Sequence, residues 1–354
     1  MGDVCLIPPD LKCCLGQRQV LLRPDPTKID SRFLLYALQS PYLQHQIGWN
    51  EGTGSTVSNL RIPVLEALRV PTPPLRVQQE IAETLGALDD RITLLRETNA
   101  TLEAIAQTLF KSWFVNFDPV RAKSEGRAPE GMDEATAALF PDSFEESALG
   151  LVPKGWETGS LGEVAQLHKR TINPLQRPTT LFEHYSLPAF DKEQAPLFET
   201  GSEIKSNKNV VPPAAVLLSK LNPHIPRVWL PDDAGENAVC STEFMVFVPH
   251  GRSSREFVYC LFTAEPFKKL LCQLVTGTSN SHQRVKPDGV LQMPMVLPPA
   301  ELLLAWVQVV APLFERAGRD RKQAKALAML RDTLLPRLIS GQLRITEVPE
   351  KIQN

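Results

Sequence analysis

A long run of apolar residues with heptad spacing is the strongest constraint on how this chain can fold. From Gln78 to Phe114 apolar residues recur at alternating steps of three and four, and no proline or central glycine interrupts them. Such spacing keeps one stripe of a helix against a partner, as in a coiled coil. At about 1.5 Å per residue, the seam would be roughly 48 Å long. The predicted seam residues are Ile81, Leu85, Leu88, Ile92, Leu95, Asn99, Leu102, Ala106, Leu109 and Trp113.

Asn99 occupies an inward-facing position of this seam, where a buried amide sets register and partner at some cost in stability. The alternative interpretation of the run is a long core helix of one larger domain. A second helical pattern, from about 301 to 339, offers the partner that a coiled coil needs.

Matches between the two halves indicate an internal duplication. Tyr36 and Leu38 recur as Tyr259 and Leu261, and Pro73-Pro74 recurs as Pro298-Pro299 at nearly the same separation. When the two proline pairs are aligned, the first seam falls on the second helical pattern, whose predicted pairing residues include Leu313, Leu327, Leu334 and Leu338. We therefore predict two long helices packed antiparallel. Asp320 and Arg331 interrupt the second seam, and Pro312 is expected to kink or restart its helix.

The duplication and the prolines at segment borders divide the chain into six parts of mixed α/β type. In the first part we expect short β-like runs at 4–7 and 19–22 and a short helix at 31–43. The counterpart of Trp156 would fall about 70 residues before Met1, so the first globular unit is expected to be partial. The predicted parts are a partial globular unit (1–75), a long helix (76–117), a linker (118–153), a complete globular unit (154–299), a second long helix (300–341) and a tail (342–354).

Composition and motifs argue against several function classes. The formal net charge is −2, there is no run of 18 apolar residues, and none of the six cysteines forms a Cys-x-x-Cys pair. We therefore expect no membrane span, no signal peptide, no zinc site, and a reducing cytoplasm. No phosphate-binding Gly-x-x-x-x-Gly-Lys-Ser/Thr and no Asn/Asp-Pro-Pro-aromatic motif is present, and the six histidines form no i, i+4 pair. The sequence predicts neither a catalytic site nor a metal site.

Recognition is the chemistry that remains, and three short stretches suit it. The first polar loop (219–227) and the second polar loop (276–286) contain cations, amides and hydroxyls but no carboxylate, and the Lys169-Arg170 pair is a third candidate on the same argument. Cations reach phosphates, and Asn, Gln, Ser and Arg can pair with base edges. The alternative is that these are ordinary polar turns. The candidate DNA-binding residues are Lys169, Arg170, Lys220, Asn222, Arg227, Thr278, Asn280, His282, Arg284 and Lys286.

Seven short motifs, in order along the chain, resemble those of the specificity (S) subunits of type I restriction-modification systems. The resemblance covers nearly the whole chain. It rests on Pro73-Pro74-Leu75 with Gln78-Gln79, 109–114 (LFKSWF), 117–123 (FDPVRAK), 138–141 (ALFP), 150–156 (GLVPKGW), 219–223 (SKLNP) and 338–341 (LISG).

This resemblance implies two target-recognition domains, each reading one half of a split target in double-stranded DNA, separated by two antiparallel helices that act as a ruler. It also implies that the helices dock modification (M) subunits, and that restriction (R) subunits join indirectly. S-adenosylmethionine, ATP and Mg²⁺ are expected on those partners, with no cofactor and no catalytic step in this chain. Family members carry a complete first recognition domain, whereas residues 1–75 match only the last part of one.

Two rival functions are compatible with parts of the sequence. One is a degenerate adaptor that binds modification subunits through its helices but reads at most one half-site. The other is an independent nuclease or methyltransferase, which the absent motifs disfavour. The interpretation that the motifs favour is a non-catalytic DNA-recognition subunit.

Overall fold

The computed structural model describes residues 2–8, 10–17, 19–49, 62–276 and 283–345. The chain divides into two compact units, and each contains part of both long helices. Unit 1 comprises 1–99 and 319–354, and unit 2 comprises 100–318. No helix in the described residues is long and apolar enough to cross a membrane.

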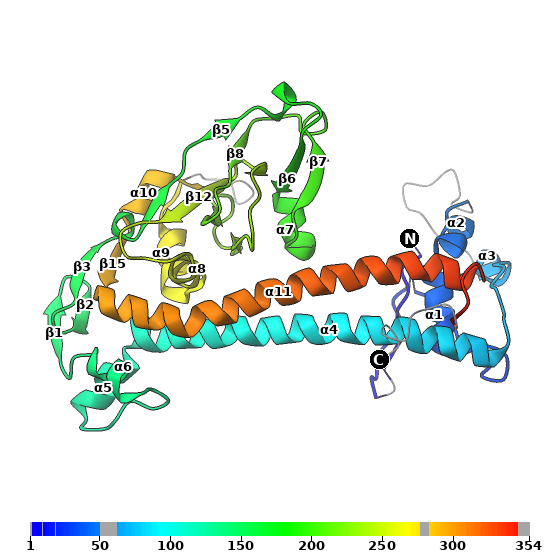
Figure 1. Cartoon of the computed structure of the whole chain (residues 1–354), viewed down its shortest axis with the longest axis horizontal. Helices are drawn as coiled ribbons and strands as arrows, with labels where there is room; N and C mark the ends of the chain where they lie inside the picture. Colours follow the sequence, from blue (N-terminus) through cyan, green and yellow to red (C-terminus); the bar gives the residue numbers. More distant parts are fainter. Residues whose placement is uncertain (1, 9, 18, 50–61, 277–282, 346–354) are drawn as a thin grey trace. The chain divides into compact units, whose positions relative to one another are not determined.

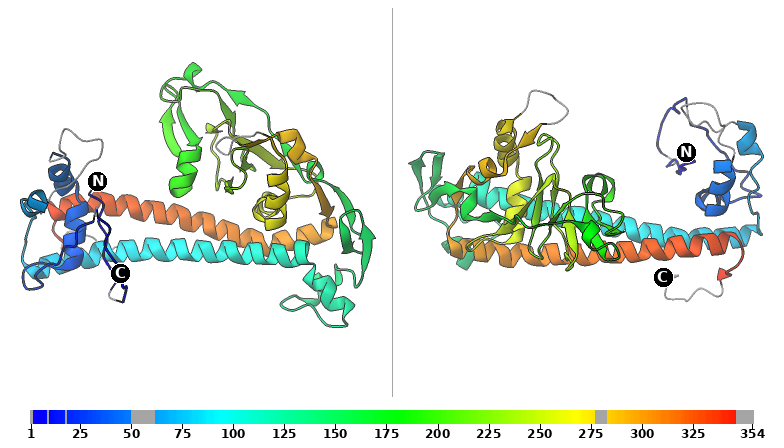
Figure 2. Two further views of the ribbon diagram at one scale, coloured as in Figure 1. Left: turned by 180° about the vertical axis from the view of Figure 1, so that it is seen from behind. Right: turned by 90° about the horizontal axis from the view of Figure 1, so that it is seen from above.

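Unit 1 is helical, and its core lies between a small helical group and the two long helices. The small helices are α1 (Ser31–Gln39), α2 (Pro41–Trp49) and α3 (Ile62–Glu66). The first half of α4 (Leu75–Lys111) lies beside the last half of α11 (Ala300–Ile339) in Figures 1 and 2. The unit 1 core consists of Phe33, Tyr36, Ala37, Leu38, Leu43, Ile81, Ala82, Leu85, Leu88, Leu334, Leu335, Leu338 and Ile339.

The predicted short helix at 31–43 is two helices with a break at Ser40. The side chain of Asp30 caps α1 by accepting a hydrogen bond from the backbone N–H of Phe33, at 2.9 Å. Ser40 is extended, and Pro41 begins α2. Proline has no N–H to donate within a helix but is favourable at the first helical position, so it ends one helix and starts the next.

The predicted β-like runs at 4–7 and 19–22 are wrong, because these residues form no strand. Seven large apolar side chains of this stretch are between 40% and 56% exposed. A strand requires a neighbour to pair with, and none lies beside these runs within the described part of unit 1. Short runs of apolar residues alone were therefore an insufficient signal here.

Unit 2 contains the β structure, in two main sheets. The four-stranded sheet has the order β10-β9-β12-β4, and the five-stranded sheet has the order β5-β8-β11-β6-β7. Only the pairing of β11 with β6 is parallel in these two sheets. The strands are β4 (Ala165–Leu167), β5 (Thr171–Ile172), β6 (Leu181–Tyr185), β7 (Leu197–Thr200), β8 (Lys208–Val210), β9 (Val216–Ser219), β10 (Val228–Trp229), β11 (Ala238–Cys240) and β12 (Phe244–Pro249).

Helices and short hairpins complete unit 2. Pairs β1–β2, β3–β15 and β13–β14 form three two-stranded sheets. The remaining strands are β1 (Phe144–Ser147), β2 (Gly150–Pro153), β3 (Glu157–Ser160), β13 (Val275–Thr276), β14 (Arg284–Val285) and β15 (Pro294–Leu297). The helices are α5 (Asp118–Ser124), α6 (Glu134–Ala138), α7 (Leu187–Glu193), α8 (Arg255–Thr263), α9 (Glu265–Gln273) and α10 (Pro287–Leu291).

Strand β9 lies between two apolar cores, which explains its uninterrupted apolar sequence. Val216 and Leu218 point into the core shared with the long helices, whereas Leu217 points toward the five-stranded sheet. All four β9 residues are buried. A strand covered on both faces is apolar throughout instead of alternating.

Aromatic side chains from the long helices fill the larger core of unit 2. Phe110 on α4 lies 5.3 Å from Phe257 and 5.9 Å from Trp306 on α11, measured between ring centroids. Just after α4, a five-residue π-helix (Ser112–Asn116) ends at Phe117, whose φ is +57°. The wider turn brings Phe114 onto Trp306 as well, with centroids 5.8 Å apart. Thus the 109–114 motif belongs to the core.

The two long helices pack antiparallel, as predicted. In unit 1, Ile92 and Leu95 of α4 cluster with Ala324 of α11, while Leu85 and Leu88 cluster with residues 334–339. Residues later in α4 therefore pack against residues earlier in α11, so the two helices run in opposite directions. Ile81, Leu85, Leu88, Ile92, Leu95, Asn99, Ala106 and Trp113 are buried, together with Leu334 and Leu338, whereas Leu102, Leu109, Leu313 and Leu327 are half-buried.

Three polar or helix-breaking positions behave differently from expectation. Helix α11 continues through Pro312, so the predicted restart is wrong. Residue 312 is exposed, where solvent can satisfy the carbonyl that loses its donor. Asp320 is buried at 2% exposure. Arg331 is satisfied within unit 1, because its Nη1 donates to Asp89 of α4 at 2.6 Å.

The duplication extends to the small helices. Helices α1 and α2 begin at 31 and 41, and their counterparts α8 and α9 begin at 255 and 265, so both pairs are separated by the same offset. Helices α3 and α4 begin at 62 and 75, and their counterparts α10 and α11 begin at 287 and 300. The separation between these counterparts is one residue larger than that between α1 and α8. Each unit therefore has the same order of helices.

The segment 118–153, predicted to be a linker with one short helix, is more structured than expected. It contains α5, α6 and the β1–β2 hairpin. Val120 and Phe140 are buried in the larger core of unit 2. The segment is therefore part of the folded unit, because its apolar residues pack against the ends of the long helices.

A polar network joins three helices of unit 1 around Asp89. The hydroxyl of Tyr36 donates to Asp89 Oδ2 at 2.7 Å, and Arg331 donates to Oδ1. Burial and the bond to Asp89 raise the pKa of Tyr36. Burial opposes the charge of Arg331, but its bonds to Asp89 and Asp332 outweigh this and raise its pKa. The network thus fixes the relative positions of α1, α4 and α11 within unit 1.

We predict that Asp89→Ala lowers the free energy of unfolding by about 1–3 kcal/mol, because it leaves the buried Tyr36 hydroxyl and the half-buried Arg331 guanidinium without this acceptor. Chemical denaturation followed by circular dichroism measures this. The control is Asp90→Ala, since Asp90 is the exposed neighbour on the same helix and should change stability by less than about 0.5 kcal/mol. Equal effects of the two variants would contradict the network's role.

We also predict that Phe110→Ala destabilises unit 2 by about 3–5 kcal/mol, because it removes a buried ring and leaves a cavity against Phe257 and Trp306. Ile105→Ala on the same helix is the control, as Ile105 is 44% exposed. Thermal unfolding monitored by tryptophan fluorescence separates them. The packing account fails if Phe110→Ala unfolds at the temperature of the unmodified chain.

Candidate nucleic-acid interface

The first and second polar loops, predicted separately from composition, lie side by side in unit 2. Leu221 and Arg284 form an isolated antiparallel bridge. The backbone N–H of Asn222 donates to the carbonyl of Gln283 at 2.8 Å, and that of Val285 donates to the carbonyl of Lys220 at 3.1 Å. Backbone hydrogen bonds therefore hold Lys220 and Arg284 on one surface, although the two residues are far apart in the sequence.

The first polar loop is rigid at its turn. Asn222 has a φ of +51°, a left-handed conformation that asparagine tolerates better than most residues. The backbone N–H of Ile225 donates back to the Asn222 carbonyl at 2.8 Å, and Pro223 is buried. The Asn222 Oδ1 atom is buried without a hydrogen-bond partner in the described residues. Its turn geometry thus accounts for asparagine at this position, independently of any ligand.

The Lys169-Arg170 pair lies close to the end of the second polar loop. It joins β4 to β5, and Lys169 Nζ is 3.8 Å from Asp288 Oδ1. Asp288 is in the first turn of α10, shortly after Lys286. The pair therefore shares this neighbourhood with the second loop, although it comes from a different part of the domain.

Two of the predicted arginines form ion pairs with carboxylates. Arg284 donates from Nε and Nη2 to the two carboxylate oxygens of Glu243, both at 3.1 Å, which raises its pKa. Arg227 donates in the same way to Asp191 at 2.6 and 2.9 Å, and this bond lowers the Asp191 pKa. A guanidinium whose N–H groups already donate to a carboxylate has fewer donors available for a phosphate. Sequence reasoning missed Glu243 and Asp191, which lie 41 and 36 positions from their partners.

Other predicted cations are more available. Lys286 and Arg170 are exposed, Lys220 is half-exposed, and none of the three has a carboxylate partner in the described part of the chain. These three are therefore the best candidates for contact with phosphate among the predicted site residues that the structure describes. Thr278, Asn280 and His282 lie outside the described residues.

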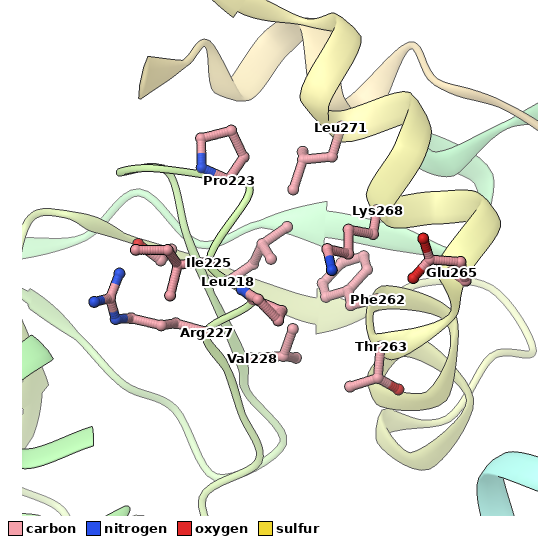
Figure 3. Close-up of a pocket in the computed structure, with 12 residues that line it drawn as sticks. Leu218, Pro223, Ile225, Arg227, Val228, Phe262, Thr263, Glu265, Lys268 and Leu271 are labelled. Atoms are coloured by element: carbon pink, nitrogen blue, oxygen red, sulfur yellow. The ribbon is translucent and has the colours of Figure 1, made fainter. Parts of the chain in front are cut away.

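A pocket of about 190 Å³ lies behind the first polar loop (Figure 3). Its floor is apolar and includes Leu218, Phe262 and Leu271. In Figure 3, Lys268 of α9 points toward the space between the loop and the helix, whereas the Arg227 guanidinium points away from that helix. Apolar side chains of the pocket therefore lie on one side of the first polar loop, and the tip of the loop (224–226) is exposed to solvent.

The interface has the chemistry of a binding surface. Among the described residues no group of three or more His, Cys, Asp or Glu side chains could hold a metal ion. The buried cysteines of unit 2 do not suggest a nucleophile, because burial raises the pKa of the Cys240 and Cys260 thiols. The two polar loops instead bring cationic and amide side chains together on a rigid backbone.

Comparisons with known proteins agree with the motifs. The family "Type I restriction modification DNA specificity domain" matches residues 1–104. The MjaIX specificity subunit of Methanocaldococcus jannaschii is 23% identical over 335 residues, covering 90% of this chain and 70% of that protein. The HindI specificity subunit of Haemophilus influenzae is 24% identical over 340 residues, covering 83% and 73%. The solved structure of an S subunit from M. genitalium is 20% identical and covers 89% of this chain and 74% of that one, with a TM-score of 0.48.

The duplicated helices, the mixed α/β unit and these sequence relatives support one class of protein, the specificity subunits of type I restriction-modification systems.

We predict that Lys220→Ala and Lys286→Ala each weaken DNA binding for every sequence tested and make the dependence of log K on log salt shallower by about one unit, because each removes one phosphate contact. Fluorescence anisotropy across a salt series measures both. Arg252→Ala is the control, since that side chain is 71% exposed and lies beside Glu301 at the start of α11. Unchanged binding in both lysine variants would remove these loops from the interface.

Proposed function

We propose that this chain is the DNA-recognition subunit of a type I restriction-modification complex. The observation that carries the proposal is the meeting of the two carboxylate-free loops on one surface of unit 2, in a chain whose relatives are named specificity subunits. Lysines on that surface supply salt-dependent affinity for the DNA backbone, and amide and guanidinium groups discriminate bases. The chain contributes recognition and no catalytic step.

The target is bipartite. The repeat of α1 to α4 by α8 to α11 supports this, because two equivalent units suit two half-sites. Residues 154–299 read one half-site. Residues 1–75 carry the helices that correspond to the last part of that domain, and contribute to the other half. A pair of antiparallel helices holds a fixed register and so sets the spacing that the complex accepts.

Modification subunits dock on the outward faces of the long helices. Several large apolar residues there are not used in the seam, and each is 44–63% exposed: Leu94 and Ile105 on α4, and Leu304, Val309 and Met329 on α11. Exposed apolar side chains on a helix suit a partner helix. The partners bring S-adenosylmethionine to methylate adenine, and restriction subunits bring ATP and Mg²⁺. The complex works in the cytoplasm. The rival role of a degenerate adaptor is not favoured, since the relatives are specificity subunits.

We predict that methylome sequencing of a host carrying this chain with its modification subunit shows adenine methylation at one bipartite motif. Deleting the chain while keeping the modification subunit should abolish methylation at that motif, because sequence selection would then be lost. A motif that persists without the chain would contradict the proposal.

A further inference from the structure

A polar groove of about 300 Å³ opens beside β5, the end strand of the five-stranded sheet. Its floor is half-buried, and its rim side chains are exposed. No carboxylate lines it; its polar groups are hydroxyl, amide and guanidinium. The lining residues are Thr171, Ile172, Asn173, Gln176, Arg177 and Asn207.

The backbone around the groove is fixed in place. Asn173 Oδ1 accepts a hydrogen bond from the Leu175 N–H at 3.1 Å and caps the short 3-10 turn Pro174–Gln176. Behind that turn, Gly201 packs so closely that an added Cβ would be 2.1 Å from the Arg177 carbonyl oxygen. Only glycine allows this approach. On the other side, Lys208 Nζ donates to Ser206 Oγ at 2.6 Å next to Asn207.

Charge and position connect the groove with the interface described above. The stretch 164–182 contains three cations, Lys169, Arg170 and Arg177, and no aspartate or glutamate. Lys169-Arg170 directly precedes Thr171, the first residue lining the groove. Leu175, on the same turn, is 44% exposed.

We propose that the exposed rim of this groove, Gln176, Arg177 and Asn207, reads base edges in the half-site bound by unit 2. This inference rests on the proposed function. Arginine pairs through two hydrogen bonds with guanine, and glutamine or asparagine with adenine. Leu175 is placed to contact a thymine methyl group, and Lys169 and Arg170 hold the DNA backbone beside the groove.

The test uses the chain assembled with its modification subunits and a duplex carrying the motif found in the methylome. Gln176→Ala, Arg177→Ala and Asn207→Ala are each measured against that duplex and against duplexes with single base-pair changes. At least one should bind the motif about 5-fold to 100-fold more weakly and lose discrimination at one base pair, with nonspecific binding nearly unchanged. Arg170→Ala should weaken binding to all duplexes equally, and Arg252→Ala should weaken binding to none.

Gly201→Ala provides a second test, because it displaces the groove wall without changing a rim side chain. It should reduce discrimination at the same base pair, in a protein whose melting temperature is recorded alongside. If all rim variants keep full discrimination between duplexes, or bind all duplexes more weakly by the same factor, base reading by the groove is overturned while the proposed function stands. If the unmodified complex prefers no sequence, both are overturned.

Discussion

Burial of apolar side chains between α4 and α11 is the interaction on which the rest of the structure depends. In unit 1 the seam runs from Ile81 to Leu95 against 324–339, and it also covers α1. In unit 2 the same two helices supply Phe110 and Trp306 to the core beneath the four-stranded sheet. Each unit therefore folds around its own part of the helix pair, and loss of the seam would expose the core of each.

A tyrosine contacts the long helices in each unit, but it does so through different interactions in the two units. Asp89 in unit 1 and Phe314 in unit 2 stand at equivalent positions, because each lies equally far from the first residue of its long helix. Tyr36 donates to Asp89, whereas the ring of Tyr259 packs on Phe314 at 5.7 Å and its hydroxyl donates to Glu103. A tyrosine on the first small helix thus anchors each unit to the long helices, by a hydrogen bond and ion-pair network in one and mainly by aromatic contact in the other.

Local sequence patterns predicted the two long helices and their antiparallel packing, whereas individual side-chain contacts between distant parts of the sequence were not predicted. Heptad spacing located α4 and α11, because one helix's own residues define its stripe. Composition selected Lys220 and Arg284, but it could not reveal that Glu243 holds Arg284, since that contact spans 41 positions. The groove rim escaped notice because Asn207 comes from a different turn than Gln176 and Arg177. The runs at 4–7 and 19–22 looked like strands but lack a partner strand within the described residues.

Disulfide cross-linking tests the antiparallel seam most directly. In a variant whose own six cysteines are replaced, Ile92→Cys with Ala324→Cys should form a cross-link under mild oxidation, because these two side chains belong to one buried cluster. Leu94→Cys with Ala324→Cys is the matched control, since Leu94 is 51% exposed and points away from the seam. Rapid cross-linking of the first pair alone is the predicted result. Cross-linking of both pairs at the same rate, or of neither, would contradict the account.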